Sequence, residues 1–113
     1  MTLSIADSTR GDFHVMQLAG DIDVESSRTL RAHIVERFAL PSARLVVDLT
    51  AVDFMDSSGL GALVSGWQLT REDGEFRIAG ANAVVRRVLS ITGMEDVFSL
   101  YPTVDEAVTG GAA

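Results

Sequence analysis

One apolar run, Leu45-Val46-Val47, constrains the fold of this chain more than any other feature of the sequence. It does not alternate with polar residues, so the strand predicted over Arg44 to Leu49 should be covered on both faces. Apolar residues recur at helical spacing on either side of it, at Leu30, Ile34 and Phe38, and again at Leu60, Leu63, Val64 and Trp67. A buried strand between two helices is typical of a sheet with parallel neighbours and helices packed on it.

Turn residues divide the rest of the chain into further elements. Gly11-Asp12 separates two alternating segments and predicts a hairpin. We expect Pro41 to end the first helix, and Asn82 and Gly93 to begin and end a third. The third helix should turn Val84, Val85, Val88 and Leu89 inward. The remaining strands are expected at Leu3 to Asp7, Phe13 to Ala19 and Glu75 to Ala79. The pattern over Glu95 to Leu100 leaves the type of element open.

The predicted fold is a single α/β domain over residues 1–108, followed by a flexible C-terminal tail over residues 109–113. Gly20 to Asp23 and Thr50 to Asp56 are expected to be connections that lead into helices, and Val104 to Val108 a further short helix. The element order is β-β-α-β-α-β-α, with or without that last helix. The sheet should be mixed, with four or five strands and with helices mainly on one face.

Composition excludes several classes of function. The 113 residues carry a net charge of -7, and all nine positive residues are arginine. Such a surface repels nucleic acid and anionic membranes and suits a basic partner. There is no cysteine, which excludes disulfides and thiolate metal sites. No stretch approaches the roughly 18 apolar residues of a membrane span, so we expect a soluble, cytoplasmic protein.

Enzyme motifs are weak in this sequence. A P-loop needs a lysine, Gly59-Leu60-Gly61 lacks the third glycine of a dinucleotide site, and there is no Gly-x-Ser-x-Gly. The two histidines, His14 and His33, are interpreted as structural. Asp21-Ile22-Asp23 could hold Mg²⁺ for phosphoryl transfer, or could form a turn with favourable charges at a helix start. We expect no catalytic residue, no metal and no cofactor.

The segment from Phe54 to Gly61 carries the strongest functional signal. It joins the central strand to a helix, and Asp56 or Ser57 could simply cap that helix. The same position would also suit a phosphate switch, because a helix start favours an added anion. A phosphate on serine adds about -1.5 to -2 charge, which nearby carboxylates and a docked partner would feel.

Three segments resemble the STAS domain family, specifically its stand-alone bacterial anti-sigma factor antagonists. Gly20-Asp21-Ile22-Asp23 resembles the family's G-[E/D]-[L/I]-D, and Thr92-Gly93-Met94 its [S/T]-G-[L/M] step. Phe54 to Gly61 resembles the phosphorylation motif M-D-S-[S/T]-G-L-G, which is the most specific of the three. The resemblance spans nearly the whole chain.

The resemblance implies a partner-switching mechanism. The unphosphorylated antagonist binds an anti-sigma factor that is also a serine kinase, which releases the sigma factor. On this resemblance, phosphorylation of Ser57 would end the binding, and a metal-dependent serine phosphatase would reset it. Asp56 would orient the serine, and Gly59 would keep the surface flat. The partner-binding residues implied are Asp21, Asp23, Asp56, Ser58, Gly59 and Leu60. The alternative is a STAS scaffold or accessory subunit of a stress-sensing or lipid-transport complex, because one fold serves many functions.

Overall fold

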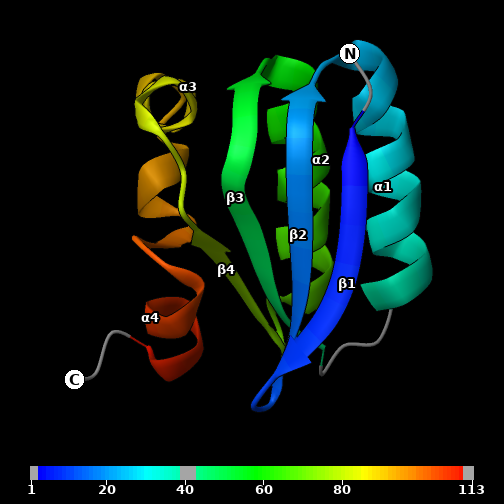
Figure 1. The fold of residues 1–113 in the computed structure, drawn as a ribbon, viewed down its shortest axis with the longest axis vertical. Helices are drawn as coiled ribbons and strands as arrows, with labels where there is room; N and C mark the ends of the chain where they lie inside the picture. The colour runs from blue at the N-terminus through cyan, green and yellow to red at the C-terminus, as the bar shows by residue number, and fades with distance from the viewer. Residues whose placement is uncertain (1–2, 39–42, 111–113) are drawn as a thin grey trace.

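Five strands form one mixed sheet in the part of the chain that the computed structural model describes, residues 3–38 and 43–110. They lie in the order β1-β2-β3-β4-β5; β1 is antiparallel to β2, and all other neighbours are parallel (Figure 1). The elements are β1 (Ser4–Arg10), β2 (Phe13–Ile22), α1 (Val24–Phe38), β3 (Arg44–Met55), α2 (Ser57–Thr70), β4 (Glu75–Ala79), α3 (Ala83–Ile91), the 3-10 helix η1 (Met94–Asp96), β5 (Ser99–Tyr101) and α4 (Val104–Thr109).

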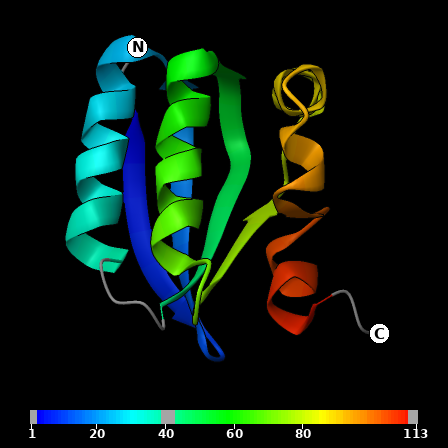
Figure 2. The ribbon, with the colours of Figure 1, turned by 180° about the vertical axis from the view of Figure 1, so that it is seen from behind.

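Strand β3 is the central strand, as its apolar run predicts. Leu45, Val46 and Val47 are fully buried, because elements cover both faces of the sheet at this point. Helices α1 and α2 cover one face (Figure 1, Figure 2). Helix α4 packs on part of the other face, where its Ala107 joins a second group of buried residues. The prediction of a mixed sheet with helices mainly on one face is therefore confirmed.

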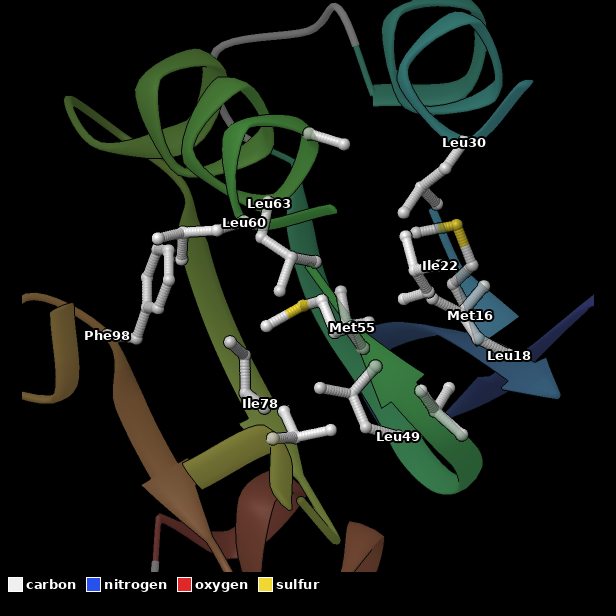
Figure 3. Packing of buried hydrophobic residues seen from close by; sticks show 14 of the residues in the cluster. Met16, Leu18, Ile22, Leu30, Leu49, Met55, Leu60, Leu63, Ile78 and Phe98 are labelled. Atoms are coloured by element: carbon white, nitrogen blue, oxygen red, sulfur yellow. The ribbon is translucent and has the colours of Figure 1, made fainter. Parts of the chain in front are cut away.

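The larger core lies between the sheet and the helices α1 and α2. Figure 3 shows Leu30 of α1 and Leu63 of α2 pointing toward Met16 of β2 and Met55 of β3, and each of these side chains is fully buried. Helix α3 adds Leu89 to the same core. The smaller core on the opposite face contains Phe13, Val15, Val46, Ala79 and Ala107.

Two predicted connections are wrong, since both segments belong to strands. Gly20 to Ile22 continues β2, and Thr50 to Met55 continues β3, where the two extensions pair with each other. The register of the pair shifts between Gln17 and Ala19 and again between Gly20 and Asp21. These irregularities break the alternation by which a strand is recognised in a sequence.

The last third of the chain holds the other differences. Strand β5 begins in the segment whose type the sequence left open, because its three residues are too few to show a period. Its pairing with Arg77–Ala79 defines it. Val84 was expected to face inward but is 50% exposed, because it lies in the first turn of α3 on the side away from the core. Helix α4 continues through Thr109, one residue into the predicted tail. Pro41 and residues 111–113 lie outside the described residues.

Asp7 on β1 joins the hairpin to α1. Its carboxylate lies 3.0 Å from Nε2 of His14 on β2 and 2.9 Å from Nε2 of His33 on α1. Burial raises the pKa of the Asp7 carboxyl, but the hydrogen bonds with His14 and His33, together with the charges of the two rings, outweigh it. The net pKa of Asp7 is therefore below its ordinary value of 3.8.

Replacing Asp7 with asparagine should make the free energy of unfolding less dependent on pH in the acidic range. Because the folded-state pKa of Asp7 is lowered, its ionised form stabilises the protein above the unfolded value of 3.8, and this contribution is lost as the pH falls through the folded pKa. The wild type should lose more free energy of unfolding than D7N between about pH 5 and pH 2, measured by urea denaturation. Equal losses of the free energy of unfolding in the wild type and D7N would contradict a lowered pKa of Asp7 in the folded protein.

Two glycines of α2 should respond oppositely to alanine. A Cβ on Gly66 would lie 2.6 Å from Cε1 of the buried Phe76 ring, whereas a Cβ on Gly61 would meet only the flexible end of Arg31. We expect G66A to destabilise the protein by about 1–2 kcal/mol, since overpacking exceeds the gain in helix propensity. G61A should be neutral or stabilising by up to about 1 kcal/mol. The midpoints of urea denaturation of both variants test the two expectations. A G66A variant as stable as the wild type would refute the expected overpacking.

Candidate functional site

The carboxyl ends of β2 and β3 lie side by side, and both strands lead directly into helices. Asp21 is opposite Phe54 and Ile22 opposite Met55 in the register of this parallel pair. The first turns of α1 and α2 therefore lie at the same edge of the sheet (Figure 1). The sequence segments Gly20 to Asp23 and Phe54 to Gly61, more than thirty residues apart in the chain, meet at this edge.

Asp56 caps helix α2 and ties it to β2. Its Oδ1 accepts hydrogen bonds from the backbone N–H groups of Ser58, at 2.9 Å, and Gly59, at 3.2 Å. Its own backbone N–H donates to the carbonyl of Ile22 at 3.1 Å. The cap satisfies N–H groups that would otherwise lack partners, and it holds the start of α2 in one orientation against β2.

Ser57 is the first residue of α2, and its side chain faces solvent. Within residues 3–38 and 43–110 its hydroxyl has no hydrogen-bond partner. Ser58 is half-buried by comparison. The Ser57 side chain is therefore accessible from solvent, and an anion added there would face the positive end of the α2 dipole.

Asp23 caps helix α1 in the same manner. Its Oδ1 accepts from the backbone N–H of Ser26 at 2.9 Å, and the Ser26 hydroxyl accepts from the backbone N–H of Asp23 at 2.9 Å. The backbone and side-chain hydrogen bonds from Ser26 lower the pKa of Asp23. The Ser26 hydroxyl also donates to the carbonyl of Asp21 at 2.9 Å.

These contacts are the ones expected for the structural interpretation of Asp21-Ile22-Asp23, a turn with favourable charges at a helix start. The Asp23 carboxylate is engaged by the helix start, and residues 3–38 and 43–110 contain no group of three or more histidine, aspartate or glutamate side chains placed to hold a metal ion. In the same part of the chain, no helix is long and apolar enough to cross a membrane.

Gly59 has a different role from the one expected. It is buried, and a Cβ there would lie 2.6 Å from both Cγ2 of Ile22 and the γ-carbon of Met55. The residue is therefore needed for close contact between α2 and the ends of β2 and β3, and it does not form a flat outer surface. Leu60 also points inward and is only 8% exposed. Among the expected partner-binding residues, Asp21, Asp23, Asp56 and Ser58 remain at least partly accessible.

An open groove of about 410 Å³ runs over the outer side of α2 beside Ser57. We call it the α2 groove; its lining includes Arg31, Ser57, Gly61, Val64, Thr92 and Met94. Thr92 and Met94 belong to the segment Thr92-Gly93-Met94, the last of the three that resemble the STAS family. The fold places this segment at the same groove as Ser57. Arg31 was missed in the sequence, because its position on a helix predicts only an exposed charge.

Exposed apolar side chains lie at the same edge of the sheet. Val24 in the first turn of α1 is 57% exposed, and Phe54 at the end of β3 is 45% exposed. Val84, the second residue of α3, is also exposed. A hydrogen bond from Asn82 Nδ2 to the carbonyl of Val52, at 2.8 Å, ties the start of α3 to β3. This edge therefore offers exposed apolar side chains, carboxylates and an exposed hydroxyl to a protein partner.

Comparison with known proteins identifies relatives of this chain. The STAS domain family model matches residues 4–107. The anti-sigma-F factor antagonist RsfB of Mycobacterium tuberculosis is 30% identical over 97% of this chain and 88% of its own length. An anti-sigma-B factor antagonist of Staphylococcus epidermidis is 31% identical over 86% of this chain and 91% of its own.

The fold also has close matches among solved structures. The crystal structure of an anti-sigma factor antagonist from Mycobacterium paratuberculosis superposes with a TM-score of 0.86 at 28% identity, covering 96% of this chain and 92% of that protein. The structural similarity therefore extends over nearly the whole chain.

The contribution of the Asp56 cap to the free energy of unfolding should be measurable. We expect D56A to lower the free energy of unfolding by about 1 kcal/mol, because two backbone N–H groups of α2 lose their acceptor. D56N keeps a capping oxygen and should lose much less. Urea denaturation of both variants provides the measurement, and equal losses would show that the charge of Asp56, and not its capping geometry, stabilises the helix.

Proposed function

This chain belongs to the STAS domain family and is an anti-sigma factor antagonist, and we propose that phosphorylation of Ser57 switches it off. The observation that carries the proposal is the position of one hydroxyl. Ser57 is exposed, begins α2, and has no hydrogen-bond partner within the described residues. Its neighbour Asp56 is held by the cap, so the serine is presented in a defined geometry.

The proposed switch acts through charge and leaves the fold intact. A phosphate adds about -1.5 to -2 charge at the start of α2, where the helix dipole is favourable. The same charge lies close to the carboxylates of Asp56 and Asp23, on an edge that a partner must cover. Docking would remove water from these charges, so the modified protein would lose affinity without unfolding.

The chemistry of this edge suits a partner with basic and apolar groups. The chain has a net charge of -7, and Val24 and Phe54 provide exposed apolar area between the carboxylates. We propose that this partner is an anti-sigma factor with serine kinase activity, which transfers phosphate from ATP to Ser57. A metal-dependent serine phosphatase would hydrolyse the phosphoester and restore binding.

Substitutions at Ser57 should separate the two states of the switch. We expect S57A to bind the anti-sigma factor with the affinity of the unphosphorylated wild type, and S57D to bind at least about tenfold more weakly, which corresponds to about 1.4 kcal/mol. S8D is the matched control, since Ser8 is exposed on β1 near the opposite end of the sheet and the variant has the same net charge. Isothermal titration calorimetry measures all three, and equal affinities of S57D and S8D would refute the charge mechanism.

The phosphorylated residue can be identified directly. Incubation with the cognate anti-sigma factor and ATP, followed by mass spectrometry, should place the phosphate on Ser57 and on no other residue. Phosphate on Ser58 alone would contradict the assignment of Ser57 and identify its neighbour as the phosphorylated residue. Recovery of a transporter or a stress-sensing scaffold in a pull-down, without a kinase, would favour the alternative role as an accessory subunit.

A further inference from the structure

We propose that Arg31 on α1 binds the phosphate of phosphorylated Ser57 within the same molecule, an inference that rests on the switch proposed above. The two residues come from different helices and line the same α2 groove. Arg31 would hold the phosphate across that groove, so the modified protein would present a filled surface in place of an open one.

The position of the Arg31 guanidinium supports this contact. Its Nη2 lies 3.1 Å from the point that a Cβ on Gly61 would occupy, so the side chain extends from α1 over the outer side of α2. Gly61 follows Ser57 by four residues, and helix positions four apart have Cβ atoms about 5–6 Å from each other on one face. The guanidinium therefore lies about one helical turn from the Ser57 side chain.

The direction of the side chain is also favourable. Side chains on a helix lean toward its N-terminus, and α1 and α2 begin at the same edge of the sheet (Figure 2). Arg31 thus leans toward the edge that carries Ser57. Gly61 has no side chain between the two, which leaves the path along α2 open.

Arg31 has no partner for its charge within the described residues. Other arginines are engaged: Arg44 bonds Glu75 at 2.8 Å, and Arg77 bonds the carbonyl of Ala107 at 2.6 Å. Arg31 forms neither an ion pair nor a hydrogen bond with any residue in 3–38 or 43–110, and it is exposed. Because the Arg31 side chain is exposed, moving it toward the phosphate breaks no ion pair or hydrogen bond with the described residues. A planar guanidinium can donate two parallel hydrogen bonds to a phosphate.

The contact would change what the phosphate does. Without Arg31, the phosphate would be a mobile charge at the end of α2. With Arg31, it would bridge α1 and α2 and cover Gly61, so a partner would meet a fixed obstacle as well as a repulsive charge. The bridge would also favour the dianionic form of the phosphate, since a nearby cation stabilises the more charged state.

The test uses the full chain with phosphoserine inserted at position 57 during translation. The ³¹P NMR resonance of the phosphate is followed against pH in the wild type, R31Q and R28Q. Arg28 is the matched control, because it is an exposed arginine on the same helix that does not line the α2 groove. We expect the titration midpoint of the phosphate to rise by a few tenths of a pH unit in R31Q, the size of shift that loss of an exposed ion pair gives. In R28Q the midpoint should stay at the wild-type value.

High salt provides a second readout. At about 1 M salt the Debye length falls to about 3 Å, so the difference between the wild type and R31Q should shrink. Identical midpoints in R31Q and R28Q at low salt would overturn the proposal, as would a shift in R28Q alone. Because the phosphoserine is installed without a kinase, this outcome is independent of whether the anti-sigma factor modifies Ser57.

Discussion

The parallel pairing of β2 and β3 at their carboxyl ends is the interaction on which the rest of the site depends. It places Asp21 opposite Phe54 and Ile22 opposite Met55, immediately before the two helices begin. Each helix then starts with an aspartate cap, and the two caps lie at one edge of the sheet. Two segments far apart in the chain thereby form a single surface with carboxylates, exposed apolar groups and an exposed hydroxyl.

Close packing beneath this edge explains how a small modification can have a defined effect. Gly59 allows α2 to approach the ends of β2 and β3 so closely that any side chain there would overlap Ile22 and Met55. The backbone around Ser57 is consequently held by the core and by the Asp56 cap. A phosphate added to such a rigid surface changes its charge and shape without requiring a conformational change, which fits the proposed antagonist switch.

Much of this architecture could be predicted from local sequence signals. The apolar run at Leu45 predicted the central strand, and Asp56 and Asn82 were recognisable as helix caps because side-chain oxygens at those positions satisfy free N–H groups. Strand β5 and the extensions of β2 and β3 could not be predicted in this way. They exist because a neighbouring strand provides their hydrogen bonds, and a short or bulged strand has no regular alternation of its own.

The sequence by itself determined the α/β class, the order of most elements, the family resemblance and the serine at a helix start. These properties follow from periodicity, capping residues and motifs, each of which acts over a few neighbouring residues. Only the tertiary structure decided that Gly59 faces the core, that Val84 is exposed, and that Arg31 lies over α2 and lines one groove with Ser57. Those facts depend on how two helices pack on one sheet, and distances between separate elements are not encoded in the local pattern of either one.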